Sequence, residues 1–176
     1  MNTQNIDALR QRISCMESSS DAGQEDFIKE SIDKCFKRIV VLINYRERCC
    51  EELRQRLVGR EKFDEEVFEK ALSKAIKYDL VDDERYAEMY AFCKTQCFRG
   101  VYGVEQHLRR MKIDFESMPK VMRILEEAGL HEEKNAKEYV AVHSSNSKDQ
   151  YSGNVKKLLN RGFSIEVAMR AVKSVR

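Results

Sequence analysis

Apolar residues recur at helical spacing along most of the chain. From Ser31 almost to the C-terminus they return every three or four residues, which places them on one face of an α-helix. The first such stripe consists of Ile32, Cys35, Phe36, Ile39, Val40 and Ile43. Residues 1–30 show little of this periodicity apart from Ile6, Leu9 and Ile13, and they end in the polar run ESSSDAGQED. We therefore expect amphipathic helices from residue 31 onward, preceded by an extension that is weakly ordered or forms a short helix.

The helical pattern repeats along the chain. An apolar residue followed by a helix-capping residue occurs at intervals of 50 residues, at Phe63-Asp64, Ile113-Asp114 and Phe163-Ser164. The same apolar stripe follows each pair: Phe68, Ala71, Leu72 and Ala75; Met118, Val121, Met122 and Leu125; Ala168, Ala171, Val172 and Val175. Three helices thus begin in register, and a fixed period of this length is typical of helical repeat arrays.

Two further helices precede each capped helix. Apolar residues of the middle helices lie at Leu53 and Leu57, at Val104 and Leu108, and at Val155, Leu158 and Leu159. The opening helices cover residues 31–45, 83–97 and about 132–143. Tyr86, Tyr90 and Cys93 mark the buried side of the second opening helix.

The joints between helices recur as well. Asp79-Leu80 and Gly129-Leu130 end the capped helices with a residue that tolerates the left-handed conformation, and Gly162 makes a turn inside the last repeat. The sequence therefore predicts an all-α fold of three tandem three-helix repeats that form an elongated, curved array. The predicted divisions are an extension over 1–30 and repeats over 31–81, 82–130 and 131–176.

The composition agrees with helices and limits the class of protein. One proline, seven glycines, no tryptophan and 35% charged residues disfavour a sheet-rich or loop-rich fold. The six cysteines fall mostly inside helical patterns without a signal peptide, so we expect reduced thiols and a cytoplasmic protein. No stretch approaches the roughly 18 consecutive apolar residues of a membrane span, so we expect no membrane contact.

Few residues suggest catalysis or metal binding. Cys93 and Cys97 stand at i, i+4, but no further ligand pair accompanies them, and burial as a small apolar residue is the favoured interpretation of Cys93. The run from His131 begins like a zinc-protease helix but has Asn135 where a second histidine is needed. Residues 100–103 have the GxxG form of a KH loop without the strands of that fold, which favours a helix-linking turn. No P-loop is present, so we expect no enzyme, no cofactor and no metal.

Basic residues cluster on the middle helices although the net charge is only +2. The clusters are Arg46 with Arg48, Arg54 with Arg56, Arg109 and Arg110 with Lys112, and Lys156 and Lys157 with Arg161. Each cluster alone is best interpreted as the solvated face of an amphipathic helix. Recurrence at one repeat position favours a cationic stripe that meets phosphates or an acidic protein groove.

The run Tyr78-Asp79-Leu80-Val81-Asp82-Asp83-Glu84-Arg85-Tyr86-Ala87 resembles the signature of the RecX regulatory proteins, Gly-Tyr-apolar-Asp-Asp-x-Arg-aromatic-Ala. The stretch GVYGVEQHLRRMKI over 100–113, the stretch YRERCCEEL over 45–53 and the closing Leu158 with Arg161-Gly162-Phe163 also resemble family segments. The resemblance covers about residues 35–176.

The chain departs from the family pattern at several turns. Asp79 and Lys112 stand where the family usually has glycine, Val101 where proline is common, and Cys49 or Cys50 where serine is common. These departures affect turns and leave the apolar stripes intact. For the signature residues Asp82, Asp83, Arg85 and Ala87 we favour a structural role, with the acids as helix cap and first-turn residues and Arg85 tied to a neighbouring carboxylate.

The resemblance implies a monomeric, non-catalytic regulator of homologous recombination, in DNA repair and the SOS response. Such a protein binds in the groove of the RecA filament on single-stranded DNA and suppresses ATP hydrolysis and strand exchange. We expect the partner contacts among Arg46, Arg54, Arg56, Arg109, Arg110, Lys112, Lys156, Lys157 and Arg161. A weak direct contact with single-stranded DNA is left open. The alternative is a helical module that binds DNA without RecA.

Overall fold

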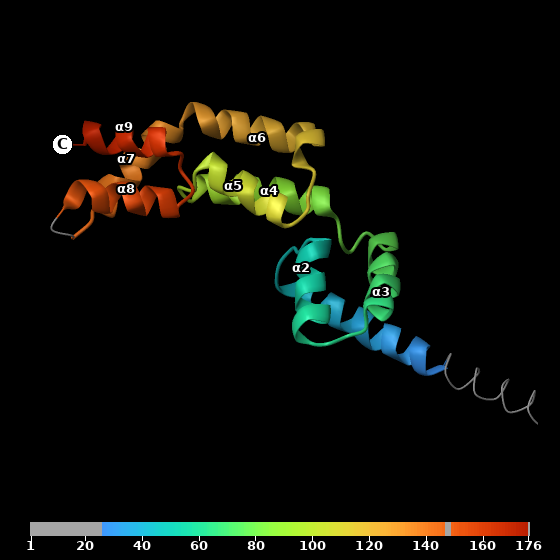
Figure 1. Ribbon diagram of the computed structural model, residues 1–176. Coiled ribbons are helices and arrows are strands. Elements are labelled where there is room, and N and C mark those ends of the chain that lie inside the picture. Colours follow the sequence, from blue (N-terminus) through green and yellow to red (C-terminus); the bar gives the residue numbers. More distant parts are fainter. Residues whose placement is uncertain (1–25, 147–148, 176) are drawn as a thin grey trace, which may run out of the picture. The chain divides into compact units, whose positions relative to one another are not determined.

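The computed structural model describes residues 26–146 and 149–175, and all regular structure in these ranges is helical (Figure 1). The first helix covers 26–45. The others are α2 (Cys50–Arg54), a π-helical segment (Gln55–Arg60), α3 (Glu65–Lys77), α4 (Asp83–Gln96), α5 (Val101–Arg110), a 3-10 turn (Phe115–Ser117), α6 (Pro119–Leu130), α7 (Glu132–Val142), α8 (Gln150–Asn160) and α9 (Ile165–Ser174). The predicted all-α class is confirmed, whereas the curved three-repeat array stays a prediction.

The first helix starts earlier than the sequence pattern indicated. Residues 26–30 already belong to it, so its beginning was wrongly placed at Ser31. Residues 1–25 of the predicted extension lie outside the described residues. Among the described residues, no helix combines the length and the hydrophobicity that a membrane crossing requires.

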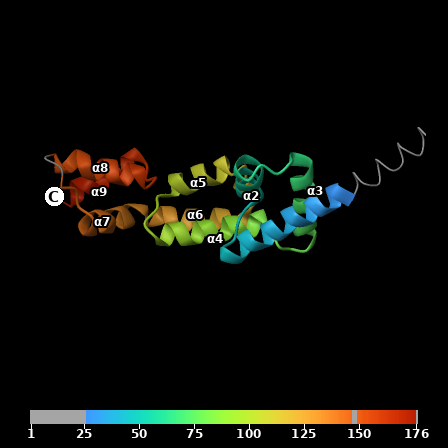
Figure 2. The same ribbon diagram turned by 90° about the horizontal axis from the view of Figure 1, so that it is seen from below.

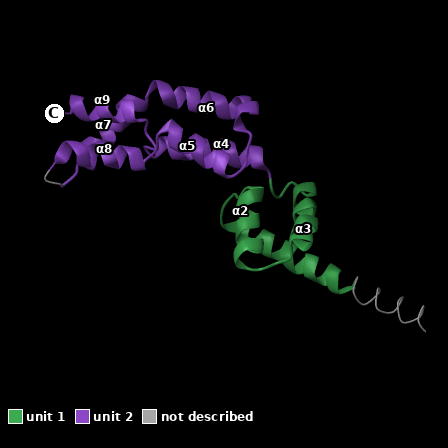
Figure 3. Ribbon diagram, in the orientation of Figure 1, with its two compact units in different colours: residues 1–81 green, residues 82–176 purple. Residues whose placement is uncertain are grey.

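The chain divides into two compact units, Met1–Val81 and Asp82–Arg176 (Figure 3). In unit 1 the first helix, α2 with its π-helical continuation, and α3 enclose one core. Its buried residues are Cys35, Ile39, Leu42, Leu53, Leu57, Phe68, Ala71, Leu72, Ala75 and Val81. The whole predicted stripe of α3 is therefore buried, with Phe68 fully excluded from solvent.

Unit 2 contains α4 to α9. Helices α4, α5 and α6 pack together, and α7, α8 and α9 form a second group beside them (Figure 2). The first group buries Tyr86, Ala87, Ala91, Val104, Leu108, Met111, Ile113, Phe115, Val121 and Leu125. The second buries Ala136, Val140, Leu158, Phe163, Val167, Ala168, Ala171 and Val172.

A left-handed residue joins the middle helix to the third helix in each group of three. Lys62, Lys112 and Gly162, spaced 50 residues apart, have φ angles of 62°, 59° and 82°. The next residue along the chain, Phe63, Ile113 or Phe163, donates its N–H to the carbonyl of Leu57, Leu108 or Leu158 at 3.1 Å. The first of these loops is one residue longer than the other two, and the π-helical segment accommodates the extra residue.

Two of the three predicted caps are confirmed, and one is wrong. Asp64 accepts the N–H of Glu66, and Ser164 accepts the N–H of Val167. Asp114 makes no side-chain cap; the 3-10 turn follows it, and α6 begins at Pro119. Proline lacks an N–H and is best accommodated in the first helical turn, so Pro119 determines where this helix starts.

Several predicted positions are corrected by the structure. Asp79 is left-handed, with φ of 54°, but Gly129 is not: it lies within α6, which runs on to Leu130. Cys93 is exposed, because α4 turns Ala91 and Thr95 inward instead. Two other residues of the predicted apolar stripes, Leu159 and Val175, are exposed. The half-buried ones are Ile32, Phe36, Val40, Ile43, Tyr90, Met118, Met122 and Val155. The inward position of α8 is taken by Asn154, whose Oδ1 accepts the N–H of Ser145 at 2.6 Å.

Candidate partner-binding surface

The residues of the Asp-Asp-x-Arg signature form the start of α4. Asp82 is its N-cap, and its Oδ1 accepts the N–H groups of Glu84 at 2.8 Å and Arg85 at 3.1 Å. Arg85 also approaches the second oxygen of Asp82, at 3.9 Å. Asp83 is the first helical residue, where an acid favours the helix dipole, and Ala87 is fully buried. These contacts are those of a helix start and its packing.

The predicted cations of unit 1 are neutralised within the protein. Arg46 pairs with Glu52. Arg54 contacts the carboxylates of Glu65 and Glu69, lies 3.8 Å from that of Glu51, and covers the ring of Phe68 at 5.3 Å. The donors of a guanidinium that several carboxylates hold are occupied, so a partner would have to break these ion pairs. We therefore assign Arg46 and Arg54 mainly to the cohesion of unit 1.

Glu61 joins two further arginines of unit 1. Arg38 donates to it through Nε at 2.7 Å and Nη2 at 3.0 Å, and Arg56 donates through Nε at 3.1 Å. These hydrogen bonds hold the pKa of Glu61 below its ordinary value, and the largest contribution is that of Arg38. Arg56 is thus also ion-paired within unit 1.

Arg109 and Arg110 are neighbours on α5 with different surroundings. Arg109 pairs with Glu116 at 3.0 Å and Glu105 at 3.5 Å, and the hydrogen bond to Glu116 is the main reason why its pKa is raised. Arg110 instead donates to Nδ1 of His107 at 3.0 Å. A guanidinium can only donate, so the Nε2–H of His107 donates to the hydroxyl of Tyr86, 2.9 Å away. Arg110 therefore contacts a neutral imidazole and forms no ion pair with a described carboxylate.

The basic residues of α8 likewise contact uncharged groups. Lys157 donates to the carbonyls of His143 and Ser144, both at 2.9 Å. Arg161 donates to the carbonyl of Cys97 at 3.3 Å and lies over the ring of Tyr139 at 4.6 Å. Lys156 is exposed and forms no ion pair with any described residue. The exposed Lys112 is the left-handed residue after α5.

Four of the predicted cations thus form no ion pair with any described carboxylate: Arg110, Lys156, Lys157 and Arg161. We call them the α5–α8 cations. Helices α5 and α8 follow one another along one side of unit 2 in two perpendicular views (Figures 1 and 2). All four lie on these helices or directly after them, whereas Arg46, Arg54, Arg56 and Arg109 form ion pairs with carboxylates of the protein.

A close backbone junction links the two helical groups of unit 2. The N–H of Gly100 donates to the carbonyl of Arg161 at 3.1 Å, and the N–H of Gly103 donates to that of Gly162 at 2.9 Å. A Cβ atom on Gly100 would lie 2.3 Å from the oxygen of Gly162, and one on Gly103 would lie 2.7 Å from its Cα. Only glycine fits at such distances.

The same junction contains a half-buried carboxylate. Oε1 of Glu132, the first residue of α7, accepts the N–H of Val101 at the start of α5, 2.8 Å away. Burial is the main reason why the pKa of Glu132 is raised. Residues 100–103 therefore form the start of α5 and pack it against the α8–α9 turn. The GxxG spacing and Gly162 were the sequence signals for this junction.

The sequence did not indicate the hollow between α4, α6 and α7. It has a volume of about 540 Å³, and its apolar lining includes Phe92, Phe98 and Leu130. Cys93 and Cys97 are both exposed, and no group of three potential metal ligands occurs among the described residues.

Comparison with known proteins gives a likeness at the level of fold. No protein-family model and no curated protein sequence matches the chain. A crystal structure of RecX from Lactobacillus salivarius is similar with a TM-score of 0.58 and 18% identity, covering 84% of this chain and 97% of that one. A crystal structure of the regulatory protein RecX is similar with a TM-score of 0.59 and 20% identity, covering 84% of this chain and 73% of that one. The chain therefore has the fold of the RecX crystal structures.

Proposed function

We propose that this chain is a RecX-like, non-catalytic regulator of homologous recombination that binds the RecA filament on DNA and inhibits its ATPase and strand exchange. The observation that carries the proposal is the fold likeness to the two RecX structures, over 84% of the chain. The sequence run Asp82-Asp83-Glu84-Arg85-Tyr86-Ala87 supports it independently, because it lies at the start of α4 and matches the family signature.

The α5–α8 cations are the residues with which unit 2 would grip the filament. Arg110 contacts an imidazole, Lys157 contacts two carbonyls, and Arg161 contacts a carbonyl and a ring, while Lys156 is exposed. These four groups can therefore bind a phosphate or carboxylate of the partner without breaking an ion pair among the described residues. Inhibition by binding needs no active site. A protein bound between filament subunits would oppose the subunit motions that accompany hydrolysis.

Co-sedimentation with RecA filaments on single-stranded DNA tests the proposal. The chain should pellet with the filaments and stay in solution with RecA or DNA alone. The variant R110Q should bind more weakly than the matched variant R109Q, since Arg109 is already paired with Glu105 and Glu116. Equal loss in both variants would refute the assignment of the surface, and no pelleting of the unaltered chain would refute the partner.

The alternative, a DNA-binding module that acts without RecA, is favoured by one observation: Lys156 is exposed and has no ion pair among the described residues. This function predicts DNA affinity without RecA that falls steeply with salt and is abolished when Arg109 and Arg110 are both replaced by glutamate. Fluorescence anisotropy with labelled single-stranded DNA at several salt concentrations measures it. An affinity independent of salt, or the absence of binding, excludes the alternative.

A further inference from the structure

Arg99 is a cation that belongs to none of the clusters visible in the sequence. It lies between α4 and α5 and is half-buried. Its Nε lies 3.5 Å from the position that a Cβ atom on Gly103 would occupy, so its side chain runs along the first turn of α5. This Nε is enclosed by the protein and, alone among the buried side-chain nitrogen and oxygen atoms of the described residues, has no hydrogen-bond partner. An enclosed donor without an acceptor is unfavourable, and more so when it is charged.

The loop that carries Arg99 is fixed on both sides. The N–H of Arg99 donates to the carbonyl of Lys94 at 3.0 Å, and the preceding Phe98 is left-handed, with φ of 54°. These two features form the Schellman motif that ends α4. On the other side, the N–H of Gly100 donates to the carbonyl of Arg161. The backbone at Arg99 is therefore held in place, so a rearrangement at this position involves its side chain.

The carboxylates of the described residues do not neutralise this guanidinium. The side chain of Arg99 forms no hydrogen bond or ion pair within 26–146 and 149–175. The carboxylate at this junction, Glu132, already accepts the N–H of Val101 at 2.8 Å. In contrast to Nε, the terminal nitrogens of Arg99 are not enclosed. A ligand can therefore reach the guanidinium from solvent without displacing a described carboxylate.

Arg99 also lies within the line of the α5–α8 cations. Arg110 stands seven residues after Gly103, about 10 Å farther along α5 and on the same side of the helix. Arg161, at the end of α8, donates to the carbonyl of Cys97, two residues before Arg99. Arg99 is therefore between Arg110 and Arg161, where the start of α5 contacts the end of α8.

We propose that Arg99 binds an aspartate or glutamate side chain of a partner protein, at the centre of the α5–α8 cations. The identity of that partner, RecA in its filament, rests on the proposed function. The half-buried position favours a carboxylate over a nucleic-acid phosphate, because a side-chain carboxylate ends a free stem whereas a backbone phosphate carries a sugar on both sides. After a rotation of the Arg99 side chain, the two carboxylate oxygens accept from Nε and a terminal nitrogen side by side. The donor that is unsatisfied in the free chain then has its acceptor.

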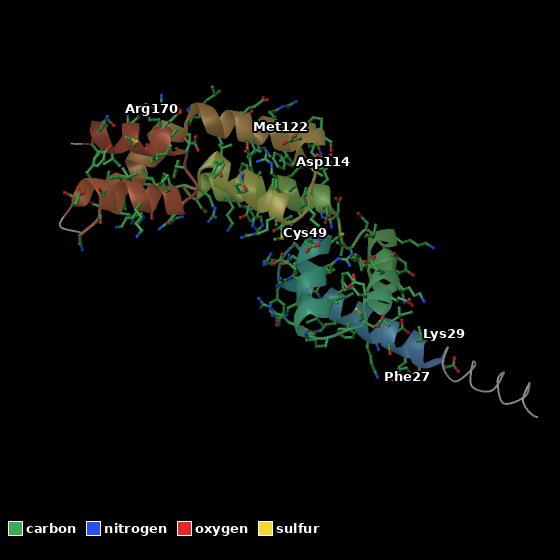
Figure 4. The ribbon with its side chains drawn as sticks, viewed as in Figure 1. Phe27, Lys29, Cys49, Asp114, Met122 and Arg170 are labelled. Carbon is green, nitrogen blue, oxygen red and sulfur yellow. The ribbon has the colours of Figure 1, made fainter. Side chains whose placement is uncertain are left out.

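Co-sedimentation with RecA filaments on single-stranded DNA tests this contact. R99Q should bind the filaments about tenfold to a hundredfold more weakly, as expected for the loss of a hydrogen-bonded charge pair. The matched variant R123Q removes an exposed arginine of α6, next to Met122 (labelled in Figure 4), and should bind like the unaltered chain. R99Q should also be at least as stable as the unaltered chain in urea, because it removes a donor that has no acceptor.

Failure of this contact can be told apart from failure of the proposed function. If R99Q pellets as strongly as the unaltered chain, Arg99 is not a partner contact, and the proposed function is unaffected. Weak pelleting together with lower stability shows a structural role of Arg99 and likewise overturns the proposal. If the unaltered chain does not pellet, the proposed function is refuted, and with it the partner named for Arg99.

Cross-linking identifies the group that Arg99 contacts. R99K places an amine at this position, and a water-soluble carbodiimide joins amines to carboxylates that touch them. Mass spectrometry of the complex should show the introduced lysine linked to an aspartate or glutamate of RecA, and R123K should show no such link. If Arg99 meets a DNA phosphate instead, R99Q weakens binding to single-stranded DNA in the absence of RecA. That result, or the absence of a cross-link at position 99, contradicts the carboxylate contact.

Discussion

Replacing Gly103 by alanine tests the backbone junction of unit 2. Gly103 lies inside α5, where alanine would ordinarily stabilise the protein by about 0.5–1 kcal/mol because it restricts the unfolded chain and favours helix. Here the added Cβ would lie 2.7 Å from the Cα of Gly162, a backbone atom that cannot rotate away. The α8–α9 turn must therefore move away from α5.

The magnitude follows from the contacts that this movement breaks. Overpacking costs about 1–3 kcal/mol. The hydrogen bonds from Gly103 to Gly162 and from Gly100 to Arg161, at 2.9 and 3.1 Å, contribute about 1 kcal/mol each. After subtracting alanine's gain, we expect G103A to lower the free energy of unfolding by about 2–4 kcal/mol.

Urea unfolding followed by circular dichroism measures this change, and the chain offers a matched control. Gly129 lies within α6, and a Cβ there would meet no atom within 4 Å. G129A should therefore stabilise the protein by about 0.5–1 kcal/mol, so the two variants differ in sign. If G103A is as stable as the unaltered chain, the close approach of α5 to the α8–α9 turn is wrong.

Four further predictions follow from individual side chains. The pKa of Glu132 is raised in the folded state, so the folded chain binds more protons there than the unfolded chain. The free energy of unfolding should therefore fall as the pH rises from the ordinary carboxyl range through the folded pKa. E132Q should remove this slope in urea titrations at several pH values. Glu61, whose pKa is lowered by Arg38, contributes stability that is lost on acidification through its folded pKa, so E61Q should remove a slope of opposite sign. D82A should lose about 1 kcal/mol in thermal unfolding through the missing cap of α4, and D82N should lose less. Burial raises the pKa of Cys35 to about 11, so a maleimide should modify the exposed Cys93 and Cys97 first and Cys35 only after unfolding, as mass spectrometry can show.

Sequence periodicity was sufficient for the helices but not for every boundary or contact. The stripe Phe68, Ala71, Leu72 and Ala75 specified the buried face of α3, because it has one strong period and a real cap at Asp64. The pattern failed at Asp114, where Pro119 decides the start of α6. It also failed at Cys93, since several small residues of α4 compete for the inward face and the neighbouring helices decide among them.

The candidate site was predicted only as a set of charges. Arg109 and Arg110 are equivalent in a sequence pattern, and only the positions of Glu105, Glu116 and His107 in space separate a satisfied cation from an available one. The glycines at 100, 103 and 162 were visible in the sequence, but their pairing was not, because Gly162 is distant in sequence and contacts residues 100 and 103 only in the folded chain.

The DNA-dependent ATPase of RecA tests the central claim most directly. The chain should be titrated into RecA filaments preassembled on single-stranded DNA, with ATP turnover measured at each ratio. We predict inhibition at less than one molecule per filament subunit, because a molecule bound between two subunits would oppose the motions of both. Unchanged turnover in the presence of a stoichiometric excess would contradict the proposed function.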